Sequence, residues 1–255
     1  MEHADRFSLK GQNALVIGGT SGIGKAIAAG YLAAGARVII AGRSQDKLAR
    51  AVADLGAHGE AFGLQADVAD FAALQGLVST TLANHGRIDT LVNCQGITNI
   101  KPAVEFSPAD WDAVIDTDLK SVFFACTEVG RHMLERGSGA IVNIASLASH
   151  RGWAGSSVYA VAKSGVFSLT QTLGAEWAGK GVRVNAISPG FVMTELNRDK
   201  MSPQRKALAL SRTPAGRFGE PDEMVGAAIY LASPAAAFVT GQTIAVDGGF
   251  LAAGM

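Results

Sequence analysis

The sequence predicts an α/β protein, a single domain with a doubly wound parallel sheet and helices on both faces. Strand-length apolar runs recur along the 255 residues and alternate with longer stretches of helical periodicity. This alternation is typical of right-handed β-α-β crossovers. Several runs are apolar at consecutive positions, as at 14–17 and 38–41, so both faces of those strands are expected to be covered by helices.

About seven strands and six principal helices are expected in alternation. The strands are expected at 13–18, 37–42, 61–67, 89–94, 139–146, 182–189 and 243–247. The helices are expected at 23–34, 45–55, 71–84, 108–136, 157–178 and 221–232. No repeat, low-complexity tract or long linker divides the chain. Residues 1–255 are therefore predicted to form one domain.

Residues 191–218 interrupt the alternation between a strand and the next helix. The segment is rich in charged residues and methionines, with a helical pattern near 203–210. Insertions of this length are usually lids or binding loops, so a substrate lid is expected here. A packed surface excursion is the alternative.

Composition excludes several classes of protein. The 22 basic residues balance 22 acidic ones, and a nucleic-acid-binding protein would normally carry a basic excess. No apolar run reaches the roughly 18 residues that cross a bilayer, and the N-terminus lacks the order of a signal peptide. Two cysteines cannot form a disulfide framework, so a cytoplasmic location is expected. The low charged fraction of 17% favours burial between subunits.

A glycine-rich segment directly follows the first strand and opens the first helix. It places Gly18, Gly22 and Gly24 where a tight turn, a close backbone approach and helix–strand packing are needed. The helix N-terminus that follows offers free N–H groups to phosphates. In this strand–loop–helix context the segment predicts a dinucleotide site; a tight turn without a ligand is the alternative.

The second strand indicates which nicotinamide nucleotide is bound. Proteins that bind NAD usually carry an acid at its end for the ribose 2′-OH, whereas this chain has Arg43 and Ser44. Arg43 can bind a 2′-phosphate through charge-assisted hydrogen bonds. NADP is therefore expected, with NAD bound through backbone contacts as the alternative.

A tyrosine and a lysine four residues apart carry the predicted chemistry. Helical spacing places Tyr159 and Lys163 on one face, and a nearby ammonium favours the phenolate of Tyr159 and lowers its pKa. Ser146 ends a strand at the sheet edge where such folds bind ligands, so its hydroxyl can bond the reacting oxygen. These residues predict proton transfer by Tyr159 coupled to hydride transfer.

With these motifs, the sequence resembles the short-chain dehydrogenase/reductase family over nearly the whole chain. Within that family, the overall sequence is most similar to sugar-acid and polyol dehydrogenases of the gluconate 5-dehydrogenase kind. The family resemblance implies a Rossmann-type fold, a homotetramer and an alcohol–ketone oxidoreduction. The expected cofactor-binding residues are Gly18, Thr20, Ser21, Gly22, Ile23, Gly24, Arg43, Ser44, Asp67, Val68, Asn93, Gly96, Tyr159, Lys163, Pro189, Gly190, Val192 and Thr194. The resemblance places Asn93 and Gly96 beside the adenosine, and Val192 and Thr194 at the nicotinamide amide.

The chain departs from the family pattern at several positions. Asp118 stands where the family usually carries an asparagine that helps hold a water linked to the lysine. We expect Asp118 to be part of the catalytic group and the protein to remain active with aspartate at this position. An ionised Asp118 would raise the pKa of Lys163 and weaken the effect of that ammonium on Tyr159. Cys94 and Gln95 replace a common Asn-Ala pair, and Ile17 replaces a threonine.

Other residues support weaker expectations. His150 and Trp153 lie between Ser146 and Tyr159 and are expected to line the substrate pocket, with exposed loop positions as the alternative. The histidines and cysteines show no ligand spacing, so no metal site is expected. Two other functions share these motifs: a 3-oxoacyl-carrier-protein reductase, for which Arg198, Lys200, Arg205 and Lys206 offer a basic entrance, and a non-catalytic dinucleotide-sensing module.

Overall fold

A single seven-stranded parallel sheet forms the centre of the molecule in the computed structural model, which describes residues 4–194 and 201–253. The strand order is β3-β2-β1-β4-β5-β6-β7, and every neighbouring pair is parallel. The strands are β1 (Asn13–Ile17), β2 (Arg37–Gly42), β3 (Ala61–Gln65), β4 (Thr90–Asn93), β5 (Gly139–Ile144), β6 (Val182–Pro189) and β7 (Thr243–Val246). The expected doubly wound α/β fold is confirmed.

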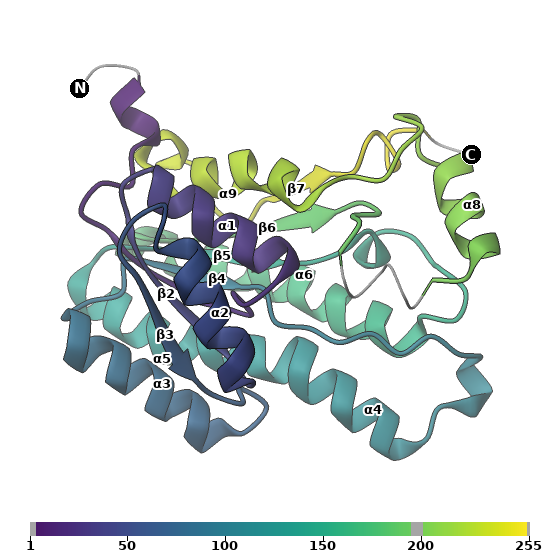
Figure 1. Cartoon of the computed structure of the whole chain (residues 1–255), viewed down its shortest axis with the longest axis horizontal. Helices are drawn as coiled ribbons and strands as arrows, with labels where there is room; N and C mark the ends of the chain where they lie inside the picture. The colour runs from purple at the N-terminus through teal and green to yellow at the C-terminus, as the bar shows by residue number, and fades with distance from the viewer. Residues whose placement is uncertain (1–3, 195–200, 254–255) are drawn as a thin grey trace.

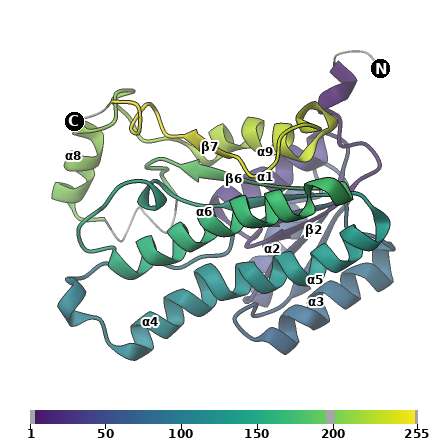
Figure 2. The ribbon, with the colours of Figure 1, turned by 180° about the vertical axis from the view of Figure 1, so that it is seen from behind.

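Helices cover both faces of this sheet. α1, α2 and α9 lie on one face, and α3, α5 and α6 lie on the other, as the two opposite views show (Figures 1 and 2). The helices are α1 (Gly22–Ala33), α2 (Gln45–Leu55), α3 (Phe71–His85), α4 (Pro108–Ile115), α5 (Ser121–Arg136), α6 (Ser157–Trp177), α8 (Pro203–Ser211) and α9 (Val225–Ala232). Among the described helices, none is both long and apolar enough to cross a membrane.

The strand sequences explain why both faces are covered. All five residues of β1 are buried, and alternate side chains enter different cores. Leu15 and Ile17 pack with α3, α5 and α6, whereas Ala14 and Val16 pack with α1, α2 and α9. Consecutive apolar residues are therefore required, because successive side chains of a strand point to opposite faces.

Polar caps set the beginnings of several helices. The Ser44 hydroxyl accepts a hydrogen bond from the Lys47 amide at the start of α2, and the Asp70 carboxylate accepts two from the first turn of α3. Ser107 and Asp110 form a capping box at α4. Each cap satisfies amide groups that have no partner within the helix.

The helix expected over 108–136 is interrupted. A π-helical turn, Asp116–Lys120, separates α4 from α5. Within this turn Asp118 is completely buried, and its Oδ1 accepts a hydrogen bond from the Ile97 amide at 2.7 Å. Such turns occur frequently at functional sites. The hydrophobic periodicity of the sequence did not indicate this π-helical turn, because the hydrogen bond to its buried carboxylate is donated by a loop distant in the chain.

The strand order reverses between β1 and β4, since β1 pairs with β2 on one side and β4 on the other. In doubly wound sheets, ligands bind outside the carboxyl ends of the strands at this point. The loops following β1, β2, β4, β5 and β6 all leave the sheet at this edge. The helical pattern expected near 203–210 is present as α8, capped by Ser202, and lies beyond the same edge (Figure 1); its role as a substrate lid stays a prediction. Residues 195–200 of the expected lid lie outside the described residues.

Two helical glycines predict opposite effects of the same substitution. A Cβ at Gly24, in α1, would collide with the Gly18 carbonyl, whereas a Cβ at Gly76, in α3, would meet nothing within 4 Å. Overpacking at the first site should lower the free energy of unfolding of Gly24→Ala by about 1–3 kcal/mol. Reduced backbone entropy of the unfolded chain should raise that of Gly76→Ala by about 0.5–1 kcal/mol. Urea unfolding at one fixed protein concentration measures both, and equal effects would contradict this packing argument.

Candidate active site

A cavity of about 650 Å³ opens along the carboxyl edge of the sheet. This volume is within the usual range for small-molecule sites. Arg43 and Asp67, which follow β2 and β3, line one end, and Trp153, Arg205 and Phe250 line the part beyond β5 and β6. An extended ligand can therefore span from the ends of β2 and β3 across to β6.

The glycine loop forms the floor of this cavity. Gly18 has a φ of +79°, and a Cβ there would lie 2.7 Å from the Cys94 carbonyl carbon, so a larger residue cannot occupy the turn. The N-cap of α1, Ser21, makes no side-chain cap hydrogen bond to the described residues. The first amides of α1 are therefore available to a ligand, as pyrophosphate binding requires.

The end of β2 presents a small polar group. Arg43 and Ser44 are exposed and line the cavity together with Lys47. Lys47 was not among the expected site residues. Its position in the first turn of α2, three residues after the helix-capping Ser44, could have indicated that it lies at this end of the cavity. The expected Asp67 and Val68 lie at the neighbouring strand end and also line the cavity.

The predicted catalytic residues converge where β5 ends and α6 begins. Tyr159 is half-buried, and the Nζ of Lys163 lies 5.8 Å from the centre of its ring. Nζ also donates a hydrogen bond to the Ile144 carbonyl at 3.1 Å. The Ser146 hydroxyl accepts one from the Ala148 amide at 3.1 Å. All three side chains line the cavity, so the group expected from the sequence is assembled in space.

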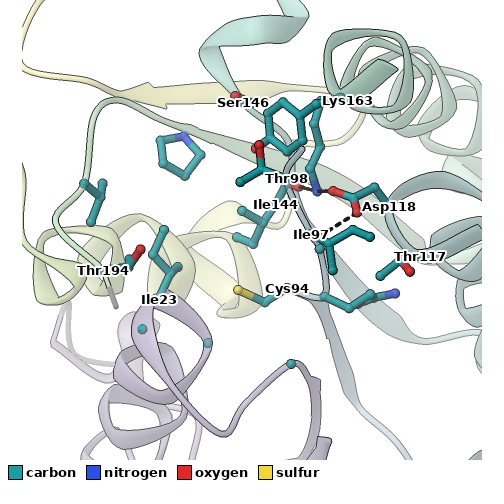
Figure 3. Close-up of a pocket in the computed structure, with 18 of the residues that line it drawn as sticks. Ile23, Cys94, Ile97, Thr98, Thr117, Asp118, Ile144, Ser146, Lys163 and Thr194 are labelled. Atoms are coloured by element: carbon teal, nitrogen blue, oxygen red, sulfur yellow. Dashed lines mark hydrogen bonds and ion pairs between the residues drawn. The ribbon is translucent and has the colours of Figure 1, made fainter. Parts of the chain in front are cut away.

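Asp118 is the fourth member of this group. Its Oδ2 lies 3.5 Å from the Lys163 Nζ, and the two side chains point toward one another (Figure 3). Both are buried, with 0% and 4% of their surfaces exposed. A Cβ at Gly96 would lie 2.8 Å from Oδ2, so Gly96 lies directly against this ion pair.

The pKa directions follow from burial and from this ion pair. Burial raises the pKa of Asp118. Burial would lower that of Lys163, but the charges of Asp118, Tyr159 and Cys94 together outweigh this effect, and the Lys163 pKa is raised. Burial also raises the pKa of Tyr159, against the lowering effect of Lys163, and Asp118 raises it further. The net lowering expected for Tyr159 from Lys163 is thus not found in the protein alone, because desolvation disfavours the phenolate.

Two expected site residues lie elsewhere. The Asn93 side chain is buried within the sheet and donates a hydrogen bond to the Asn143 Oδ1 at 2.9 Å, because it ends β4 pointing into the core. The His150 Nε2 lies 3.0 Å from the Ser188 Oγ, and its ring packs edge-on against Phe167. Neither side chain lines the cavity.

The segment after β6 closes the cavity opposite the glycine loop. Pro189, Gly190, Val192 and Thr194 all line it. A Cβ at Gly22 would lie 3.3 Å from the Thr194 Cγ2, so Thr194 faces the start of α1. The Met193 amide donates to the Gly219 carbonyl at 2.8 Å, which fixes this segment beside the chain that leads to α9.

An aromatic cluster forms the wall beyond β6. The ring centre of Trp153 lies 5.0 Å from that of Phe191 and 6.3 Å from that of Phe250. The expected position of Trp153 in the cavity is therefore observed, whereas Phe191 and Phe250 were missed, and Arg205 was expected only as part of a basic entrance. The apolar C-terminal tail was the only signal for Phe250.

The fold and cavity define a Rossmann-type oxidoreductase. The uncapped α1 terminus fits a dinucleotide pyrophosphate, and a hydroxyl, a phenol and an ammonium meet in the same cavity. Among the described residues, no three histidine, cysteine, aspartate or glutamate side chains are grouped to hold a metal ion.

Comparisons with known proteins agree with this class. A family model described as Enoyl-(Acyl carrier protein) reductase, one of the short-chain dehydrogenase/reductase models, matches residues 18–251. The chain belongs to the short-chain dehydrogenase/reductase family. It is 42% identical over 245 residues to a D-threitol dehydrogenase of Mycolicibacterium smegmatis, covering 96% of this chain and 94% of that protein.

Two further relatives are named for different activities. A 3-oxoacyl-[acyl-carrier-protein] reductase of Synechocystis is 40% identical over 247 residues, covering 96% of this chain and 98% of that protein. The solved gluconate 5-dehydrogenase of Burkholderia cenocepacia, in complex with NADP and tartrate, has a TM-score of 0.94 and 40% identity, covering 98% of this chain and all (100%) of that chain.

The position of Asn93 predicts a structural rather than a cofactor-binding effect. Its amide also lies 3.3 Å from the Cys126 Sγ, and Asn143 continues the network by donating to the Thr170 hydroxyl at 3.0 Å. Asn93→Ala would leave the buried Asn143 carbonyl without its amide donor, and should lower the free energy of unfolding by about 1–3 kcal/mol. Urea unfolding and NADP⁺ titration test this prediction. An unchanged free energy of unfolding together with a weakened NADP⁺ affinity would contradict it and indicate that Asn93 contributes to cofactor binding.

Proposed function

We propose that this protein is an NADP-dependent dehydrogenase/reductase that interconverts a secondary alcohol and a ketone on a sugar acid or polyol. The observation that carries the proposal is the meeting of Ser146, Tyr159 and Lys163 in the cavity whose floor is the glycine loop. The gluconate 5-dehydrogenase and D-threitol dehydrogenase relatives support the substrate class.

The choice of NADP rests on the end of β2. Arg43, Ser44 and Lys47 line the cavity there. No carboxylate lies between the end of β2 and Asp46. A 2′-phosphate would gain charge-assisted hydrogen bonds from these side chains. The NADP held by the solved gluconate 5-dehydrogenase supports this choice. The uncapped α1 terminus would hold the pyrophosphate, and Val192 and Thr194 would hold the nicotinamide amide.

The catalytic residues divide the work between proton transfer and positioning. When bound, the nicotinamide supplies the hydride acceptor or donor. Tyr159 takes the proton of the alcohol in oxidation and returns it in reduction, and the Ser146 hydroxyl donates a hydrogen bond to the reacting oxygen. The Lys163 ammonium favours the Tyr159 phenolate. Asp118 keeps that ammonium charged and in place.

We also propose a cytoplasmic homotetramer. Large apolar side chains are exposed on neighbouring helices, Trp111 on α4, Phe123 on α5 and Val161 on α6, at 44%, 42% and 48%. An apolar surface of this kind supports burial between subunits. Both cysteines are free, which suits a reducing compartment. Light scattering after gel filtration measures the assembly, and a monomer at micromolar concentration would contradict it.

Hydride transfer is tested by following the absorbance of the reduced cofactor. The protein is mixed with NADP⁺ or NAD⁺ and a panel of sugar acids and polyols, and with NADPH and a 3-oxoacyl ester in the reverse direction. We expect turnover with NADP⁺ on the sugar panel, and a loss of about 10²–10⁴-fold or more in Tyr159→Phe with NADP⁺ affinity retained. Turnover of the 3-oxoacyl ester alone would favour the reductase alternative. NADP⁺ binding without any turnover would favour a sensing module.

The acidic partner of Lys163 predicts a shift in pH dependence. The charge of Asp118 raises the pKa of Tyr159, and alcohol oxidation requires the phenolate. In Asp118→Asn that pKa should fall, so the rise of kcat/KM for oxidation should move to lower pH while activity stays within about tenfold. The pH profile of kcat/KM between about pH 6 and 10 measures this.

Asp116→Asn is the matched control for this prediction. Asp116 lies in the same π-helical turn but is only half-buried and pairs with Lys120 at 3.0 Å. Its substitution should leave the profile unchanged. Identical profiles for wild type and Asp118→Asn would contradict the electrostatic role of Asp118, and a gain of several orders of magnitude in turnover would indicate that the natural protein is not a true enzyme.

A further inference from the structure

Two arginines, Arg205 and Arg212, lie over the indole of Trp153 at the substrate end of the cavity, and a third, Arg151, lines the same cavity. The guanidinium carbon of Arg205 lies 5.4 Å from the centre of the indole, and that of Arg212 lies 5.8 Å from it. Arg151 precedes Trp153 by two residues and lines the same cavity, as does Arg205. Arg205 and Arg212 come from α8 and its C-terminal end, and Arg151 comes from the loop between Ser146 and Tyr159, so the fold brings basic side chains from two distant segments to this end of the cavity.

None of these charges has an acidic partner among residues 4–194 and 201–253. Arg205 donates to the Ala154 carbonyl at 2.8 Å and to the Ser156 hydroxyl at 2.9 Å, which are both neutral. Arg151 and Arg212 make no ion pair with a described residue. By contrast, Arg37, Arg87, Arg136 and Arg217 all pair with carboxylates. Among residues 4–194 and 201–253, the substrate end thus carries a local positive charge without an acidic partner, in a chain with 22 basic and 22 acidic residues.

The Arg205 side chain is held in a defined orientation. Its two hydrogen bonds and its position over Trp153 attach helix α8 to the loop that leads into α6. Burial lowers the pKa of Arg205, which reflects partial loss of water around a charge. A guanidinium has five N–H donors, so donors beyond the two used here are available to a ligand. Neighbouring like charges repel, and an anion between them would remove that cost.

We propose that Arg205 and Arg151 bind the carboxylate of the substrate, which makes the protein a dehydrogenase of sugar acids rather than of neutral polyols. This inference rests on the proposed function and narrows its substrate class. Arg205 supplies a fixed donor pair, and the exposed Arg151 adds a mobile one. Arg212, outside the cavity, adds charge. Ser156, which Arg205 holds, lies one helical turn before Tyr159, so the carboxylate site and the proton-transfer residue share one segment of the chain.

Matched substrate pairs test this inference, because each pair differs only in one terminal group. Kinetics with NADP⁺ compare D-gluconate with D-glucitol, galactonate with galactitol, and threonate with threitol. In wild type, kcat/KM should favour the acid by about tenfold to a hundredfold in at least one pair, the usual worth of a charge-assisted hydrogen bond. The KM of the acid should rise with NaCl concentration, whereas that of the polyol should not.

Charge-removing variants identify the residues. Arg151→Gln changes a side chain with no hydrogen bond to the described residues, so folding should be unaffected. Arg205→Gln also breaks the contact between α8 and the loop. This variant is therefore judged by the ratio of kcat/KM for the acid to kcat/KM for the matching polyol. Both should lower this ratio by about tenfold or more. Arg37→Gln is the matched control, because it removes one positive charge at the start of β2, on the opposite edge of the sheet, and should leave the ratio unchanged.

The outcomes separate this inference from the proposed function. Turnover of polyols at least equal to that of acids, or a ratio unchanged in both variants, would overturn the inference and leave the proposed function standing. If no member of the panel turns over, the proposed function fails. The carboxylate site is then decided by thermal shift with NADP⁺ present, where D-gluconate should raise Tm more than D-glucitol in wild type but not in Arg151→Gln. Turnover of acetoacetyl-carrier protein with inactive sugar acids would instead assign the arginines to an acidic carrier protein.

Discussion

The organisation of the active site depends on the burial of one ammonium group. Lys163 is 4% exposed, and a buried charge is costly unless it is paired and hydrogen-bonded. Its partners come from different parts of the chain: the Ile144 carbonyl ends β5, and Asp118 lies in the π-helical turn, where the Ile97 amide holds it. Satisfying this one charge therefore fixes β5, α6, the turn before α5 and the loop after β4 relative to one another.

That arrangement explains why an aspartate is tolerated where the family usually has an asparagine. Asp118 and Lys163 together bury no net charge, and the Ile97 amide satisfies the second carboxylate oxygen. The consequence for chemistry is electrostatic. Asp118 stabilises the ammonium but raises the pKa of Tyr159, so the residue that stabilises the site also opposes phenolate formation. A bound nicotinamide cation would act in the opposite direction.

Charge is distributed unequally along the cavity. The catalytic centre contains a balanced ion pair, whereas Arg205 and Arg151 at the substrate end have no acidic partner among the described residues. An enzyme discriminates between substrates through groups left unpaired when the wrong one is bound. The rigid part of such a site is Arg205, held by Ala154 and Ser156, and rigid donors lose less entropy on binding.

The sequence by itself determined the parallel sheet, the glycine loop and the Tyr159–Lys163 pair, because local patterns carry them: consecutive apolar residues, a strand–glycine–helix order and helical spacing. It could not place side chains whose partners are distant in the chain. Asn93 points into the sheet toward Asn143, and His150 toward Ser188, although both lie beside residues of the cavity. The π-helical turn and the position of Arg205 and Arg212 over Trp153 likewise result from contacts between segments far apart, which only the tertiary structure decides.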